Sequence, residues 1–361
     1  MPQPSLAAPP HPARSTPVPR QATAGGRLRV LDGLRLLAAL MVMLYHFASP
    51  DIWGGTRFGV LGAIAPYSWL GVELFFLISG FVICMSTWGK TLRDFVRSRV
   101  VRLFPAYWFC VLLTGAVLLV PGLPVDGDRP TVSTILTNLT MVQDPLGVAE
   151  VDHSYWTLWA ELRFYLLFAV VAWLGVNSRR VLAFCWVWTA AVVLAGDSGI
   201  PLLSTLANPG YAPLFISGIA FYLIRRDGPR SRQPWALLGV NWLFAQHNLV
   251  DTAQNYSTGQ HQLSWTVCVT VLTGCYALMA AVALGLLDRI DWRWLSVAGA
   301  ISYPLYLVHQ AIGTTALRAW HDAAPAWVVL PGVMAGMVAV GWLIHRFVER
   351  PGSKALRKAF R

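Results

Sequence analysis

Ionisable side chains interrupt a long apolar segment near the start of the chain. The segment spans residues 29–48, which is long enough to cross a bilayer, yet it carries Asp32, Arg35 and His46. Such groups are costly inside a membrane and mark a functional-site hypothesis. Arg35 and His46 are eleven residues apart, so a helix places them on one face, roughly 16 Å apart along its axis. A guanidinium and an imidazole on one face indicate anion binding combined with acid–base chemistry.

Three further apolar segments carry an ionisable group at a similar expected depth. If the N-terminus is cytoplasmic, His46 lies near the outer end of its segment, and Glu73 lies roughly 7 Å below the outer surface. On the same basis Glu161 lies roughly 9 Å below that surface, and His309 lies in the outer half of its segment. His309 also follows Tyr306 at helical spacing, which gives that segment a polar stripe of its own. Helical bundles build sites from side chains that converge in this way.

Arginines gather towards the inner end of the same bundle. Arg35 lies about 9 Å from the inner surface, and Arg97, Arg99 and Arg102 directly precede the sequence FPAYW. The planar fork of arginine matches the geometry of a phosphate group. The inner end therefore has the character of an anion site, and the outer end that of an acid–base site. A long donor with a phosphorylated head and a reactive tail would fit this polarity.

These residues must be positioned by an all-α polytopic membrane protein. The chain has 361 residues, of which 56% are hydrophobic and 12% charged, whereas about a quarter of the residues of a soluble domain are charged. The segment at 234–246 is short for a span of roughly 20 residues, so its topology stays open. About ten transmembrane helices are expected, at residues 29–48, 68–88, 104–121, 155–175, 179–196, 209–224, 234–246, 262–287, 295–316 and 325–345.

Positive charge alternates along the chain in step with these segments. Lysines and arginines cluster in every second loop, whereas the outer loops hold only Arg57, Arg129 and Arg318. This bias predicts that both termini are cytoplasmic in a multi-pass protein of the plasma (inner) membrane. The net charge of +11 is then explained by contact with the lipid bilayer and needs no nucleic acid. The long outer loop after the third segment is acidic and carries Asp126, Asp128, Asp144, Glu150 and Asp152.

The two ends of the chain differ from the central part in composition. Residues 1–28 are rich in Pro and Ala and lack the apolar core of a signal peptide, which predicts a disordered cytoplasmic tail. Residues 351–361 form a basic cytoplasmic tail, and residues 29–350 form a single transmembrane domain. The five cysteines lie within apolar segments and lack the spacing of metal ligands, so no metal is expected.

Five motifs follow one another between residues 29 and 351. They are LDGLRLLAALMVMLYH with Arg35 and His46, GVELFFLISGFVI at 71–83, RSRVVRLFPAYW with Arg99 and Arg102, WTLWAELRFYLLF with Glu161, and ISYPLYLVH at 301–309. In this order they resemble the acyltransferase-3 family of membrane O-acyltransferases, whose members modify polysaccharides, lipooligosaccharides, peptidoglycan and macrolide antibiotics. The fourth motif departs from the family pattern, because Thr157 replaces the usual Ser, and Leu162 and Arg163 stand where Glu and Gln are common.

The resemblance implies an acyl-CoA donor, with acetyl-CoA expected, that enters from the cytoplasm as a co-substrate. Its phosphates would bind near Arg99 and Arg102, with Arg35 further along the channel. The acceptor would be a saccharide or glycan that carries a hydroxyl group. The product would be an O-acylated acceptor.

His46 is the expected centre of the chemistry. It either deprotonates the acceptor hydroxyl or accepts the acyl group itself. Glu161 or Glu73 would orient it or stabilise its imidazolium, as a carboxylate does in a catalytic triad. The expected substrate-binding residues are His309, Tyr306 and Arg163. His309 and Tyr306 would bind the acceptor or polarise the thioester carbonyl, and Arg163 adds a charge at membrane depth that would affect acceptor selection.

Other functions stay open. The acceptor could be a small cytoplasmic molecule such as a macrolide, which would receive its acyl group on the inner side. Ionisable groups within spans also form proton relays, so a proton-coupled transporter is an alternative of another class. Each residue also has a structural interpretation, for example an ion pair of Glu161 with Arg163 or a helix-to-helix hydrogen bond of His309.

Overall fold

The computed structural model describes residues 28–55, 58–256 and 263–360, and all secondary structure in these ranges is helical. The predicted N-terminal tail therefore lies outside the described residues except for Leu28, as does Arg57. Besides short 3₁₀ turns, the helices are α1 (Arg29–Phe47), α2 (Pro50–Trp53), α3 (Val60–Ile64), α4 (Gly71–Thr87), α5 (Leu92–Leu118), α6 (Val132–Asn138), α7 (Trp156–Leu174), α8 (Ser178–Ser198), α9 (Pro201–Ala207), α10 (Ala212–Asp227), α11 (Arg232–Tyr256), α12 (Trp265–Ala283), α13 (Arg293–Trp320), α14 (Ala326–Ile344), the π-helix η4 (His345–Glu349) and α15 (Arg350–Ala359).

Every predicted apolar segment coincides with a helix, but not every helix is apolar enough to span a bilayer by itself. Seven stretches of the described chain are long and apolar enough, and the helices α10, α11 and α13 are not among them. α10 has only 16 residues, and α13 carries polar groups such as His309 and Gln310 along its length. The expected all-helical architecture is confirmed for the described residues, whereas the number of ten spans and the side of each terminus stay predictions.

The seventh predicted segment is the one whose length differs most from expectation. Instead of 13 residues at 234–246, α11 runs over 25 residues. Its extension beyond residue 246 begins with the polar residues His247 and Asn248, which is why hydropathy alone ended the segment too early. Asn248 donates to the carbonyl of Pro209 at 2.7 Å, and buried Asn241 pairs with Thr189. These hydrogen bonds attach the polar part of α11 to neighbouring elements.

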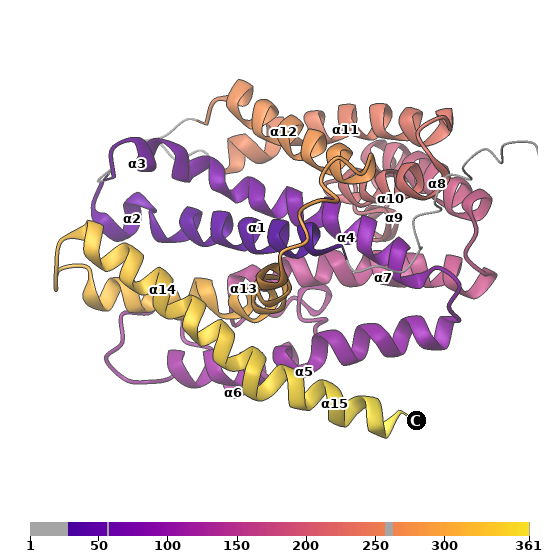
Figure 1. Ribbon diagram of the computed structural model, residues 1–361. Helices are drawn as coiled ribbons and strands as arrows, with labels where there is room; N and C mark the ends of the chain where they lie inside the picture. The colour runs from indigo at the N-terminus through magenta and orange to yellow at the C-terminus, as the bar shows by residue number, and fades with distance from the viewer. Residues whose placement is uncertain (1–27, 56–57, 257–262, 361) are drawn as a thin grey trace, which may run out of the picture.

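Helix α1 runs through the middle of the molecule, where it packs against α4 on one side and α13 on the other (Figure 1). Small residues allow close approach, as is common between membrane helices. A Cβ on Gly71 of α4 would lie 2.6 Å from the carbonyl oxygen of Ala38 in α1. α4 meets α10 still more closely, since a Cβ on Gly80 would lie 2.1 Å from the Phe215 carbonyl oxygen. These contacts fix the register of α1 and α4, which carry Arg35, His46 and Glu73 of the predicted site.

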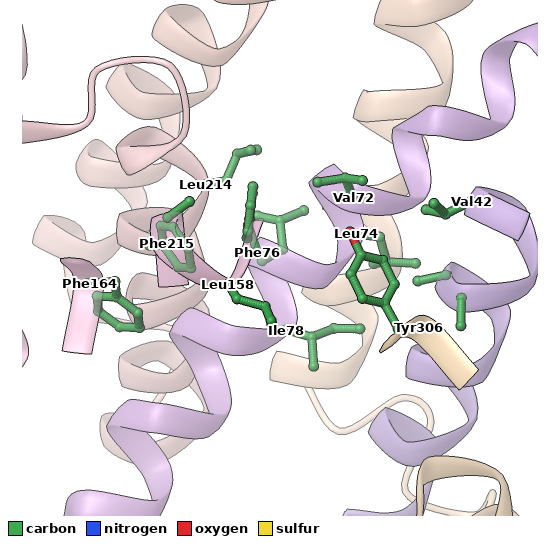
Figure 2. Close-up of a cluster of buried hydrophobic side chains, with 14 of the residues drawn as sticks. Val42, Val72, Leu74, Phe76, Ile78, Leu158, Phe164, Leu214, Phe215 and Tyr306 are labelled. Atoms are coloured by element: carbon green, nitrogen blue, oxygen red, sulfur yellow. The ribbon is translucent and has the colours of Figure 1, made fainter. Parts of the chain in front are cut away.

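A buried apolar cluster lies beside this site (Figure 2). It extends from Phe164 and Phe215, whose rings stack with centroids 4.6 Å apart, to Val42 of α1. Tyr306 of α13 is at the α1 side of the cluster, together with Val72 of α4. Polar groups therefore meet the apolar core at Tyr306, and the candidate site begins there.

Candidate active site

A cavity of about 1280 Å³ surrounds the end of α1. We call it the His46 cavity, because the imidazole of His46, the next-to-last residue of α1, forms part of its wall. Its volume exceeds the roughly 300–1,000 Å³ of typical small-molecule sites. Further parts of the wall come from the segment after α1, the segment between α5 and α7, the start of α7 and helix α13. They include Asp51, Glu150, His153, Trp156, Tyr306 and Gln310.

Within this wall, His46 lies in contact with two other rings. The ring of Tyr45 stands edge-on to it with centroids 4.9 Å apart. The ring of His309 lies on the other helix, with centroids 5.4 Å apart and an interplanar angle of 50°. The structure thus brings His46 and His309 together, as their predicted depths require. His309 itself is 1% exposed and is not part of the cavity wall.

The hydrogen bonds of His309 determine which of its ring nitrogens carries the proton. Its Nδ1 lies 2.7 Å from the carbonyl oxygen of Tyr306. A carbonyl oxygen can only accept, so Nδ1 must donate. In the neutral ring Nε2 is then a lone-pair acceptor, and it has no hydrogen-bond partner among the described residues. A buried base therefore lies directly beside His46.

The backbone of α13 around His309 is held by a segment that sequence reasoning did not single out. Asp152, which is 0% exposed, accepts from the N–H of Ala311 at 2.9 Å and from the hydroxyl of Ser154 at 2.6 Å. The Tyr155 hydroxyl donates to the carbonyl of Leu307 at 3.0 Å. In the sequence, Asp152 is only one of several acidic residues in a predicted outer loop. Its only local signal is that it caps the turn His153–Tyr155 through the N–H of Ser154.

A second, smaller cavity of about 100 Å³ holds the predicted anion-binding residues. We call it the Arg35 cavity. Arg35 of α1 meets Arg99 and Arg102 of α5 in its wall, and Glu161 of α7 completes the charged set. Glu161 accepts a hydrogen bond from the hydroxyl of Ser79 in α4. Guanidinium groups from two helices that are far apart in sequence, α1 and α5, therefore share one small space.

The three arginines differ in their existing partners. Arg99 donates to the hydroxyls of Ser98 at 3.1 Å and Ser86 at 3.3 Å. Arg102 forms an ion pair of 3.5 Å with Glu349, which is buried in η4. Within the described part of the chain, Arg35 makes no hydrogen bond or ion pair. Arg35 and Arg99 thus retain donors for an anionic ligand, whereas Arg102 is oriented by a carboxylate.

Tyr306 connects the two cavities. It lies in the wall of both, as does Val72. Its hydroxyl group is hydrogen-bonded to that of Thr157 at 2.9 Å, and its ring stands edge-on to Phe75 with centroids 5.4 Å apart. The guanidinium groups therefore lie on one side of this tyrosine and the imidazole of His46 on the other.

Two of the predicted carboxylates lie away from His46. Glu161 is one helical turn beyond Thr157 in α7, and this places it in the Arg35 cavity. Glu73 is 6% exposed and lines neither cavity. It lies on α4, which packs against α12 as well as against α1 and α10. The predicted depth of each carboxylate along its helix could not indicate which face of the helix the side chain occupies.

Arg163 also lies outside both cavities. Its guanidinium donates to the carbonyl of Thr205 at 3.0 Å and lies 5.5 Å from the ring centroid of Trp159. These contacts direct it towards α9. Among the described residues there is also no cluster of three or more His, Cys, Asp or Glu that could hold a metal ion.

Comparison with known proteins gives consistent matches. The family model Acyl_transf_3, described as an acyltransferase domain, matches residues 28–346. The acyltransferase MdmB of Streptomyces mycarofaciens is 25% identical over 91% of this chain and 92% of its own length. Nodulation protein 10 of Rhizobium leguminosarum bv. viciae is 25% identical over 93% of this chain and 96% of its own length. The O-acetyltransferase OatA of Staphylococcus aureus is 30% identical over 39% of this chain and 24% of its own length. No solved structure matches the chain.

Proposed function

The chain belongs to the acyltransferase-3 family, and from this membership we propose that it transfers an acyl group, expected to be acetyl, from cytoplasmic acyl-CoA to a hydroxyl group of a saccharide or glycan. As a member of the family it is a multi-pass membrane acyltransferase, and the group that it transfers is not an aminoacyl group. The observation that carries the finer proposal is the pair of cavities that adjoin at Tyr306. The Arg35 cavity offers guanidinium groups, and the His46 cavity offers an imidazole.

The Arg35 cavity is proposed to receive the donor. Arginine binds phosphate through two parallel hydrogen bonds, and such charge-assisted bonds are roughly twice as strong as neutral ones. At about 100 Å³ the cavity suits a narrow chain better than a nucleotide. We therefore place the phosphates at Arg99 and Arg102 and let the pantetheine arm pass Arg35 towards Tyr306. The thioester then reaches the border with the His46 cavity.

The His46 cavity is proposed to receive the acceptor. His46 takes the proton of the acceptor hydroxyl while its oxygen forms a bond to the acyl carbon. The bond from this carbon to the CoA sulfur breaks, and the thiolate leaves with the proton that His46 returns. Acyl transfer through His46 itself remains the alternative route, in which the imidazole carries the acyl group between the two steps. Neither route needs a metal.

The proposal is tested with the purified protein in liposomes, acetyl-CoA labelled in the acetyl group, and a panel of glycan acceptors. Labelled acceptor must form with the wild type, and His46→Ala must abolish transfer while expression and membrane insertion stay intact. Near-normal transfer by His46→Ala would remove this residue from the chemistry. Solute flux without acyl-CoA would instead support the proton-coupled transporter.

A small acceptor such as a macrolide remains the second candidate, because the volume of the His46 cavity admits one. The two acceptor classes are separated by the membrane face at which acceptor must be added. Mass spectrometry of surface glycans and secreted small molecules, with and without the protein, then identifies the acceptor by the mass of the acyl group it gains. Turnover that requires acceptor on the same face as acyl-CoA would favour the small molecule.

A further inference from the structure

Among the described residues His46 has a basic neighbour, but it forms no hydrogen bond or ion pair with a carboxylate. Neither Glu161 nor Glu73 forms part of the cavity wall around His46. The ring of His309 does lie next to it, with centroids 5.4 Å apart. Because His309 is 1% exposed and outside the wall, it cannot reach the acceptor. Any influence on the reaction must pass through His46.

The unused nitrogen of His309 is the group through which this influence can act. Its Nδ1–H is fixed by the Tyr306 carbonyl at 2.7 Å, so Nε2 is an acceptor with no partner among the described residues. A buried acceptor without a partner loses the hydrogen bonds it had to water, and native proteins keep few such atoms without a reason. Catalytic hydrogen bonds are often loose before substrate binds and tighten afterwards. A rotation of the His46 ring towards Nε2 of His309 would form a hydrogen bond between the two imidazoles.

The surroundings of His309 suit a neighbouring His46 that becomes positively charged during the reaction. The buried carboxylate of Asp152 acts electrostatically on His309 and also binds the N–H of Ala311, two residues further along α13. The same segment holds the carbonyl of Leu307 through Tyr155. Backbone on both sides of His309 is thus fixed, and the carboxylate that fixes one side also acts electrostatically on the His309 ring.

We infer that His309 is a positioning residue for His46. During acyl transfer a ring N–H of His46 donates a hydrogen bond to Nε2 of His309. This inference rests on the proposed function. The bond leaves the other nitrogen of His46 unprotonated and directed into the cavity. That nitrogen takes the acceptor proton as the new carbon–oxygen bond forms and the thioester bond breaks, and it then returns the proton to the CoA thiolate. After His46 takes the proton and before it returns it, the pair of imidazoles carries a positive charge. Asp152 offsets this charge, as the carboxylate of a triad does for its histidine.

Two amide substitutions separate this role from a structural one. In His309→Gln the side-chain oxygen reaches the position of Nε2 and can accept from His46. In His309→Asn the amide nitrogen takes the position of Nδ1 and can donate to the Tyr306 carbonyl, but nothing replaces Nε2. We expect His309→Gln to keep kcat within about 10-fold of wild type, whereas His309→Asn loses about 100-fold or more, the usual scale of acid–base contributions. The KM for acetyl-CoA should stay unchanged in both.

The opposite order, with His309→Asn active and His309→Gln inactive, would show that His309 only supports the backbone at Tyr306. Equal activities of the two variants, whether high or low, would also overturn the inference. Wild type and His46→Ala are measured alongside: a wild type that transfers no acyl group from acetyl-CoA refutes the proposed function and not merely this residue.

A spectroscopic measurement on the wild-type protein guards against variants that fail to fold. Nitrogen NMR of the protein labelled at its histidines, in nanodiscs, reports the tautomer of each ring, and the signal of His309 is assigned by its loss in either variant or in His309→Ala. We expect a neutral His309 with its proton on Nδ1 and an unprotonated Nε2. A proton on Nε2 would exclude the proposed acceptor and so overturn the inference.

Discussion

Tyr306 and Thr157 join their hydroxyl groups at 2.9 Å at the border between the Arg35 cavity and the His46 cavity. Tyr306 comes from α13 and Thr157 from α7, so the bond ties together two helices that are far apart in sequence. In the proposed reaction the thioester must pass this pair to reach His46. The pair is therefore placed to separate donor from water until the acceptor is bound.

Removing the ring of Tyr306 should uncouple donor consumption from transfer. With Tyr306→Ala, water from the His46 cavity can reach the thioester, so we expect acetyl-CoA hydrolysis without acceptor to rise while transfer falls. The measurement is release of free thiol with and without acceptor. Thr157→Ser keeps the hydroxyl group and serves as the matched control, which should behave as wild type. An unchanged ratio of hydrolysis to transfer in Tyr306→Ala would contradict a separating role.

Loss of Arg99 should weaken donor binding rather than the chemical step. A hydrogen bond to a charged group contributes about 1.5–3 kcal/mol, so Arg99→Ala should raise the KM for acetyl-CoA about 10-fold or more with little change in kcat. Arg97→Ala is the matched control, since Arg97 lies on the same helix, binds the carbonyl of Arg357 at 2.9 Å and does not line the Arg35 cavity. Loss of affinity for the acceptor alone in Arg99→Ala would refute the phosphate assignment.

The two predicted carboxylates should differ in effect. Glu161 shares a cavity with three arginines, and Glu161→Gln keeps an acceptor for Ser79 but removes the charge. We expect this variant to lower kcat/KM for acetyl-CoA by about 10-fold or more, the scale of one lost charge-assisted contact. Glu73→Gln should leave kcat/KM close to wild type, because Glu73 lines neither cavity. Steady-state kinetics of both variants decide, and a larger effect of Glu73→Gln would reverse the assignment.

The sequence was most informative where both residues of a predicted pair lie on the same helix. The spacing of Arg35 and His46 along α1, and of Tyr306 and His309 along α13, follows from helical periodicity alone, and both pairs lie at the cavities or beside them. Contacts between distant segments were not accessible in this way. The ion pair of Arg102 with Glu349 joins residues 247 positions apart, and no local pattern specifies it.

Loops posed a different difficulty. Asp152 lies in an irregular segment, where neither a period of 3.6 nor hydropathy indicates which side chain turns inwards. Its burial depends on the N–H of Ala311, a group in a helix formed far along the chain. Conversely, Glu73 had a clear periodic position, but the face it occupies depends on how α4 packs against α12. Tertiary packing, not local preference, decided both cases.

Asp152 should be required for the structure around His309. One of its oxygens accepts from the N–H of Ala311 at 2.9 Å, and the other accepts from Ser154. Asp152→Asn places an amide donor against one of these donors and removes the buried charge. We expect the free energy of unfolding to fall by about 1–3 kcal/mol, the cost of an unsatisfied buried group.

Thermal unfolding of Asp152→Asn in detergent is the direct measurement, and initial rates of transfer well below the unfolding temperature give the effect on activity. Asp144→Asn, an exposed change in the same loop, is the control and should alter neither. If Asp152→Asn unfolds at the temperature of wild type, its carboxylate does not hold α13 in place. If it also transfers acetyl groups at the wild-type rate, its charge does not support the pair of imidazoles.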